Sequence, residues 1–260
     1  MDLNLSGRTA LITGASKGIG RAAAEALAAE GCSLVLVSRT AADLEALKGE
    51  IERKYKVHVT ISALDLSKGE SVTKLARDHS TITILINNAG AIPGGNLLEM
   101  DEARWRAAWD LKVFGYINLC RAFYPLMRGW RTGVIINVIG SAALTHDPEY
   151  ICGVTGNAAL AAFTQSLGST SARDGIRVLG VHPGPTSTDR LVTLMRKKAK
   201  DRTGSEDNWP ELVKPLPFGR AATPQELGAA IAFLASERSA YTSGTIVTID
   251  GGASARAQSF

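Results

Sequence analysis

The segment from Gly14 to Gly20 has the residue types and spacing of a phosphate-binding turn. It reads Gly-Ala-Ser-Lys-Gly-Ile-Gly and follows an apolar run, Thr9–Thr13, that is typical of a β-strand. Glycines let the backbone approach a pyrophosphate closely, and a helix that begins at Gly18 offers free N–H groups to it. The alternative is a tight turn without a ligand, but the flanking strand and helix favour nucleotide binding. The expected contacts come from Gly14, Ser16, Lys17, Gly18, Ile19 and Gly20.

The end of the second apolar run, Ser33–Ser38, indicates which dinucleotide fits. A site for NAD usually has an acid there for the ribose 2′-hydroxyl, whereas an arginine accommodates the 2′-phosphate of NADP. This chain has Ser38 and then Arg39, and Lys17 adds a second cation. A guanidinium can hold a phosphate through two N–H groups, and an ammonium adds a point charge. We therefore predict NADP(H) as the cofactor, the alternative being that both cations are ordinary surface residues.

The elements that position these residues alternate between strands and helices. The strand candidates are rich in Val and Ile and almost continuously apolar, as in a parallel sheet covered on both faces. The pattern predicts an α/β protein: one Rossmann-type, doubly wound parallel sheet with helices on both faces, in a single domain over residues 1–260. The predicted strands are Thr9–Thr13, Ser33–Ser38, Val57–Ser62, Ile82–Ile86, Val134–Ile139, Arg177–His182 and Thr245–Ile249. The predicted helices include Gly18–Glu30, Ala41–Lys54, Asp101–Arg128, Gly156–Arg173 and Pro224–Ala235.

The stretch from Pro183 to Arg220 has no clear periodicity and is predicted to be irregular. Long irregular segments in compact domains often form lids, so we expect a substrate lid at about 186–218. The stretch contains basic residues, for which a solvated face is the alternative. Its apolar residues suggest an apolar or aromatic substrate body, and its basic residues allow an anionic tail. The apolar ones are Leu191, Val192, Leu194, Trp209 and Phe218.

Further motifs in the same order extend the pattern from about Leu5 to Gly252. Together with the glycine turn, they make the chain similar to the short-chain dehydrogenase/reductase family. The motifs are Thr13-Gly14-xxx-Gly18-Ile19-Gly20, Asp65, Asn87-Asn88-Ala89-Gly90, Pro183-Gly184 with Thr186 and Thr188, Gly219-Arg220, and Asp250-Gly251-Gly252. The resemblance implies additional cofactor contacts by Asp65, Leu66, Asn88, Ala89, Gly90, Pro183, Gly184, Thr186 and Thr188. It also implies a homo-oligomer, a dimer or tetramer.

The chain departs from this family where the chemistry takes place. Members of the family use an Asn, a Ser, a Tyr and a Lys, the last two in a Tyr-xxx-Lys pattern. Alignment by flanking residues places Lys112 at the Asn position, Gly140 at the Ser position, Gly153 at the Tyr position and Asn157 at the Lys position. The Asn and the Lys have thus exchanged places, which suggests a rebuilt site.

Four residues are candidates for that rebuilt site: Lys112, Ser141, Tyr150 and Asn157. Lys112 is the only charge on an apolar stripe of its predicted helix, and a desolvated lysine can act as an acid or base. The alternative is a lysine whose stem packs at a subunit interface. Ser141 lies one residue after the Ser position and Tyr150 three residues before the Tyr position. His146, in the preceding loop, is a weaker candidate.

Bulk composition argues against nucleic-acid binding, a metal site and a membrane span. The chain has 260 residues, a net charge of +4 and 45% hydrophobic residues, which is ordinary for a globular protein and shows no basic footprint for nucleic acid. Cys32, Cys120 and Cys152 show neither disulfide nor metal-ligand spacing, so we expect no metal and a reducing, cytoplasmic location. We expect no membrane span.

These features favour an NADP(H)-dependent oxidoreductase that acts on a carbonyl or alcohol of a small molecule through a non-standard proton relay. Two alternatives remain at this point. One is a lyase-type enzyme that uses bound NADP without net redox change. The other is a non-catalytic subunit that senses NADP or serves as a scaffold.

Overall fold

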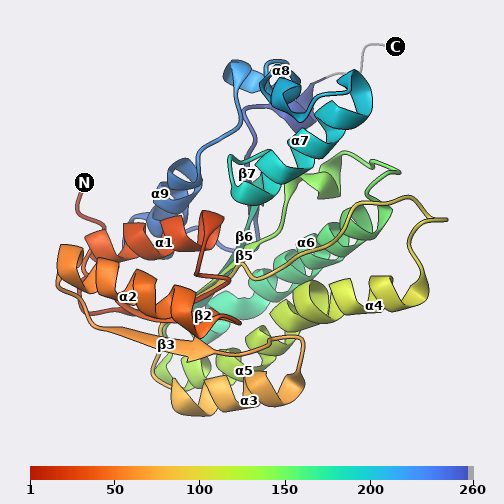
Figure 1. Cartoon of the computed structure of the whole chain (residues 1–260). Helices are drawn as coiled ribbons and strands as arrows, with labels where there is room; N and C mark the ends of the chain where they lie inside the picture. The colour runs from red at the N-terminus through yellow and green to blue at the C-terminus, as the bar shows by residue number, and fades with distance from the viewer. Residues whose placement is uncertain (257–260) are drawn as a thin grey trace.

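Seven parallel strands form one sheet at the centre of the molecule (Figure 1). The computed structural model describes residues 1–256, apart from the side chain of Lys197. The strand order is β3-β2-β1-β4-β5-β6-β7, so the chain reverses its direction of travel between β1 and β4. The strands are β1 (Thr9–Thr13), β2 (Ser33–Ser38), β3 (Val59–Ala63), β4 (Ile84–Asn87), β5 (Gly133–Val138), β6 (Ile176–Pro183) and β7 (Ile246–Ile249). The predicted doubly wound α/β fold is confirmed.

Helices cover both faces of the sheet, and each face has its own core. Along β1, Ala10 and Ile12 belong to one apolar cluster and Leu11 to the other. The first cluster also contains residues of α1 (Gly18–Ala29), α2 (Ala41–Tyr55) and α9 (Pro224–Ala235). The second contains residues of α3 (Gly69–Asp78) and α5 (Gly115–Trp130), and side chains of α6 (Ile151–Ser171) pack against it. Burial on both faces explains why the strands are almost continuously apolar.

The prediction of one helix over Asp101–Arg128 was wrong in one respect. The helix consists of α4 (Glu102–Trp109) and α5, joined by a π-helical turn over Asp110–Phe114. Such turns insert one residue into the helical ladder, and they occur often at functional sites. Sequence periodicity averages over this single insertion, which is why the pattern did not indicate it.

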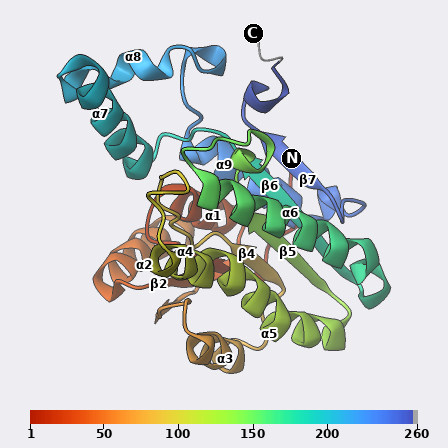
Figure 2. The same ribbon diagram turned by 90° about the vertical axis from the view of Figure 1, so that its right-hand side faces the viewer.

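The prediction of an irregular stretch between Pro183 and Arg220 was also wrong. It contains α7 (Asp189–Thr203) and the short α8 (Trp209–Val213), which project beyond the sheet in two views (Figures 1 and 2). The Thr188 hydroxyl accepts a hydrogen bond from the Leu191 N–H at the start of α7, and Gly204 ends the helix in the left-handed conformation. Both capping residues are of types typical of helix ends, so the sequence does indicate them. The helix was missed because it is strongly polar and packs little of its surface.

Two smaller differences affect the site. Helix α6 begins at Ile151 rather than Gly156, so Gly153 and Asn157 both lie within it. Helix α3 was not among the predicted helices. It buries only Ser71, Val72 and Leu75, which leaves a weak apolar pattern.

Candidate active site

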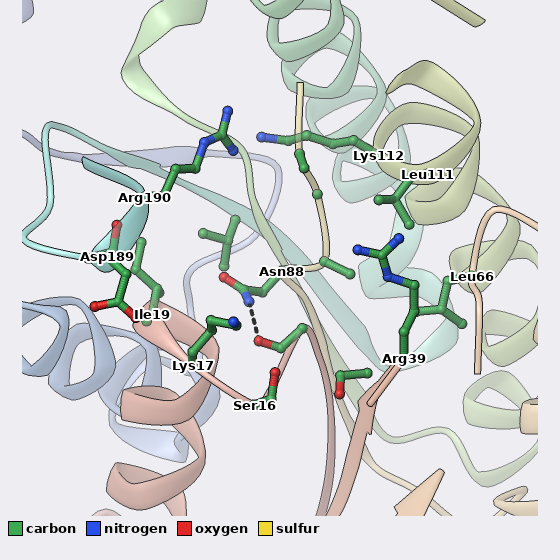
Figure 3. A pocket seen from close by; sticks show the side chains of 18 of the residues that line it. Ser16, Lys17, Ile19, Arg39, Leu66, Asn88, Leu111, Lys112, Asp189 and Arg190 are labelled. Atoms are coloured by element: carbon green, nitrogen blue, oxygen red, sulfur yellow. Dashed lines mark hydrogen bonds between the residues drawn. The ribbon is translucent and has the colours of Figure 1, made fainter. Parts of the chain in front are cut away.

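A cavity of about 530 Å³ opens at the carboxyl ends of the central strands, where the strand order reverses (Figure 3). In open α/β sheets this switch point is the usual ligand site. Its lining from the first half of the chain is Gly14, Ser16, Lys17, Gly18, Ile19, Ser38, Arg39, Thr40, Asp43, Leu64, Leu66, Asn88, Ala89, Gly90, Ala91, Leu111 and Lys112. The second half adds Val138, Ile139, Gly140, Pro183, Thr188, Asp189 and Arg190.

The glycine turn is held by the segment that follows β4. The Asn88 side-chain amide donates to the carbonyl oxygens of Thr13 at 3.0 Å and Gly14 at 3.3 Å (Figure 3). The Thr13 hydroxyl accepts from the N–H groups of Asn88 and Ala89 at 2.9 and 3.0 Å. A Cβ on Gly20 would collide with the Asn88 amide, so this glycine is required by packing and does not itself line the cavity. These contacts fix the turn against the sheet and leave its outer side to a ligand.

The end of β2 provides a polar corner of the cavity. Within residues 1–256, the buried Ser38 hydroxyl has no hydrogen-bond partner, and neither Lys17 nor Arg39 forms an ion pair. Both cations are exposed and line the same cavity, and Lys17 lies at the N-cap of α1. A hydroxyl and two cations next to a helix N-terminus form an environment suited to phosphate.

Four of the predicted cofactor residues do not line the cavity: Gly20, Asp65, Gly184 and Thr186. Asp65 instead accepts hydrogen bonds from the Ser67 N–H and hydroxyl, which lower the pKa of its carboxyl. A side chain on Gly184 would collide with Asp250. The buried Thr186 hydroxyl donates to the Gly184 carbonyl at 3.0 Å. Gly184 and Thr186 thus help to shape the loop between β6 and α7.

Lys112 is carried into the cavity by the π-helical turn. Its aliphatic stem lies against Gly90, where a Cβ would come within 2.8 Å of the lysine Cδ. Its Nζ donates a hydrogen bond of 2.5 Å to the carbonyl oxygen of Ile139, at the end of β5. Burial, helped by the positive charge of Arg190, lowers the pKa of Lys112 to about 7. The ammonium can therefore release its proton near neutral pH.

Tyr150 takes the space that a side chain at position 153 would fill. The phenol end of its ring lies over the Cα of Gly153, so any Cβ there would overlap the ring. Tyr150 is partly buried just before α6, and burial raises the pKa of its hydroxyl, an effect that Arg190 counters. Tyr150 does not itself line the cavity. The glycine at the tyrosine position and the upstream tyrosine are thus two parts of one packing arrangement.

The other two candidates lie behind the cavity wall. Asn157 is buried, and its amide lies against Gly140, where a Cβ would be 3.3 Å from the Asn157 Nδ2. Within the described residues, the Asn157 Oδ1 has no hydrogen-bond partner. Ser141 begins a short 3₁₀ turn, Ser141–Leu144, and is not part of the lining. Gly140 and Asn157, the residues that the sequence alignment placed at the Ser and Lys positions, thus lie side by side.

Arg190 is the residue that sequence reasoning missed. It lies in the first turn of α7, lines the cavity and donates a hydrogen bond of 2.6 Å to the carbonyl oxygen of Ile92. Its position two residues after Thr188 was the available signal, but the surrounding stretch was interpreted as irregular. Other residues that the sequence analysis singled out do not form part of the cavity lining. The apolar residues Leu191, Val192, Leu194, Trp209 and Phe218 do not line this cavity, and His146 is exposed.

No helix in residues 1–256 is long and apolar enough to cross a membrane. The same residues contain no cluster of three His, Cys, Asp or Glu side chains that could hold a metal ion.

Comparison with known proteins relates the whole chain to one group of enzymes. A family model described as enoyl-(acyl carrier protein) reductase matches residues 14–254. The oxidoreductase UcpA of Salmonella typhimurium is 33% identical over 95% of both chains. The 2-keto-3-deoxy-L-fuconate dehydrogenase of Xanthomonas campestris is 30% identical over 95% of this chain and 80% of its own length. The crystal structure of L-sorbose reductase from Gluconobacter frateurii, complexed with NADPH and L-sorbose, has a TM-score of 0.92 at 31% identity. It covers 99% of this chain and 100% of the reductase.

Proposed function

The chain belongs to the short-chain dehydrogenase/reductase family of oxidoreductases, and from this premise we propose that it interconverts a carbonyl compound and its alcohol with NADP(H), through a proton relay built on Lys112. One observation carries the proposal. The Lys112 ammonium lies in the same cavity as the glycine turn and the cation pair Lys17 and Arg39. A group that can exchange a proton near neutral pH therefore shares one cavity with a dinucleotide site.

The residues present fit NADP(H). Ser38, Arg39 and Lys17 would hold the 2′-phosphate, since they offer a hydroxyl and two cations that are not ion-paired in residues 1–256. The glycine turn and the N-terminus of α1 would hold the pyrophosphate. Asn88, Ala89, Gly90, Pro183 and Thr188 line the remaining length of the cavity. When bound, the cofactor supplies or accepts a hydride at the carbon that is reduced or oxidised.

Lys112 would serve as the general acid for reduction. As the carbonyl carbon gains a hydride, its oxygen becomes an alkoxide, and the ammonium can stabilise that charge and then transfer a proton to it. The neutral amine regains its proton from solvent through the open side of the cavity. In the reverse direction, the neutral amine accepts the proton of the alcohol. A pKa of about 7 gives comparable amounts of both forms at neutral pH.

The other three candidates would support this step from the wall. Tyr150, with its raised pKa, stays protonated, and we propose that it donates a hydrogen bond to the reacting oxygen. Asn157 would act as a positioning residue through Gly140, and Ser141 through the turn that follows. The lid that we propose at 186–218 consists of α7, α8 and their connections, with Arg190 at its inner end.

Absorbance of NADPH tests the proposal directly. The purified chain is mixed with NADPH and a panel of ketones and aldehydes, and with NADP⁺ and the matching alcohols. Sugars and sugar acids are the first members of the panel, because two relatives are named for a ketose and a 2-keto sugar acid. Net NADPH consumption that depends on the carbonyl compound supports the proposal. Substrate turnover without net change of NADPH, or tight NADPH binding without any turnover, would contradict it.

A further inference from the structure

Arg190 and Lys112 approach the same part of the cavity from opposite walls. Figure 3 shows Arg190 extending from α7 and Lys112 from the π-helical turn, with their charged ends directed toward one another. Lys17 and Arg39, which we assign to the cofactor phosphate, lie in another part of the same view. Arg190 and Lys112 are thus a facing pair of cations, separate from both Lys17 and Arg39.

The described residues do not neutralise the Arg190–Lys112 group. Neither side chain forms an ion pair within residues 1–256. The partners of both side chains are neutral: Arg190 is held by the Ile92 carbonyl and by the Tyr150 hydroxyl, and Lys112 by the Ile139 carbonyl. The carboxylates in the lining, Asp43 and Asp189, are likewise not ion-paired with either cation.

Facing like charges repel, and the repulsion is strong where water is partly excluded. The effect is visible on Lys112, whose pKa is lowered first by burial and then by the charge of Arg190. A ligand with negative charge relieves this repulsion when it binds between the two groups. The free energy of that relief contributes to affinity and favours anionic over neutral ligands.

We propose that the substrate carries an acidic group that Arg190 binds, so that the enzyme acts on an oxo acid and the corresponding hydroxy acid. The inference rests on the proposed function, in which Lys112 contacts the reacting oxygen. A guanidinium offers two parallel N–H groups that match a carboxylate or phosphate, and it remains charged across the working pH range. The hydrogen bond to Ile92 uses one terminal nitrogen of Arg190 and the contact with the Tyr150 hydroxyl uses a further N–H group, so the acid would bind the N–H groups that remain.

The test separates substrate binding from turnover. Isothermal titration measures binding of oxalate and of inorganic phosphate to the full chain saturated with NADP⁺. The variants are Arg190→Met, Arg190→Lys and the control Arg173→Met, which removes an exposed arginine in the turn after α6, outside both the cavity and the proposed lid. We expect an anion to bind the parent. Arg190→Met should weaken anion binding at least about tenfold, the change expected from losing one charged hydrogen bond. Arg190→Lys should weaken anion binding less, and the control should leave it unchanged. Preference for oxalate assigns the acid as a carboxylate, and preference for phosphate assigns it as a phosphate.

Two outcomes would overturn the inference. One is that neither anion binds, or that Arg190→Met binds both as the parent does. The other is that Arg190→Met loses affinity for NADP⁺ while anions bind only when NADP⁺ is absent, which would assign Arg190 to the cofactor pyrophosphate. A different result would contradict the proposed function: NADPH would not be consumed, although anion binding would still depend on Arg190. Where turnover is found, an oxo acid should exceed its methyl ester in kcat/KM, and Arg190→Met should remove that difference.

Discussion

Replacing Lys112 with methionine keeps most of the aliphatic contact with Gly90 and removes the ammonium. If this group stabilises the developing alkoxide, turnover should fall by about 10²–10³-fold, the usual loss when one such charge is deleted. Affinity for NADPH should change little, because Lys17 and Arg39 are untouched. The measurement is kcat for carbonyl reduction and, separately, Kd for NADPH, with Lys54→Met as a matched control on an exposed lysine of α2 outside the cavity.

The pH dependence of the parent gives a second readout of the same group. Reduction needs the protonated ammonium, so kcat should fall about tenfold per pH unit above the Lys112 pKa of about 7. Oxidation of the alcohol needs the neutral amine and should fall below that pH. In the Lys112→Met variant, the fall of the reduction rate above this pH and the fall of the oxidation rate below it should both disappear. A variant that retains the parent rate, or a parent profile without a limb near pH 7, would refute the role of Lys112.

Stability offers a measurement that does not require a substrate. The folded chain holds the Lys112 pKa at about 7, against 10.5 for an unperturbed lysine. Above pH 10.5 the lysine is neutral in the folded and unfolded chains, and it imposes no penalty. As the pH falls toward 7, the unfolded chain binds a proton that the folded chain does not, so the penalty grows by at most about 1.4 kcal/mol per pH unit and is constant below pH 7.

The comparison is therefore between parent and Lys112→Met in urea at several pH values. The advantage of the variant should be largest at pH 7 and should shrink by up to about 3 kcal/mol by pH 9. Loss of the hydrogen bond to Ile139 destabilises the variant, but it does so at every pH, so the slope is unaffected. A difference in unfolding free energy that is independent of pH would show that Lys112 is not desolvated as the structure indicates.

Four further outcomes are expected. NADPH should bind more tightly than NADH, and the double change Ser38→Asp with Arg39→Ala should weaken or reverse the preference; equal affinities for the two cofactors in the parent would contradict the assignment. Tyr150→Phe should lower kcat about tenfold, the value of one hydrogen bond in the transition state, with KM nearly constant. Gly153→Ala should destabilise the fold by about 1–3 kcal/mol, measured by unfolding in urea, because the added Cβ overlaps the Tyr150 ring. An unchanged kcat would remove Tyr150 from the site. Sedimentation at micromolar concentration should find a dimer or tetramer built on α5 and α6, whose exposed alanines Ala158, Ala159 and Ala162 permit close helix packing, and a monomer would disprove this.

The half of the cavity that we assign to the cofactor was largely determined by the sequence itself. A phosphate-binding turn is made of consecutive residues. It can therefore be recognised in the sequence as one motif, which consists of the strand Thr9–Thr13, the glycines and the helix that follows. Gly14, Lys17, Ser38 and Arg39 all line the cavity as expected. The sheet was equally legible, because a strand buried on both faces must be apolar at every position.

The substrate half depended on contacts between distant segments, which no local pattern encodes. Gly153 and Asn157 were recognised as departures from the family, but only packing shows that the Tyr150 ring fills the place of the absent side chain and that Asn157 lies against Gly140. Lys112 was identified by its helical stripe, yet its lowered pKa comes from burial and from Arg190, which is 78 positions away in the chain (190 − 112). Charge and desolvation act through space, so the chemistry of this lysine was decided by the fold that surrounds it.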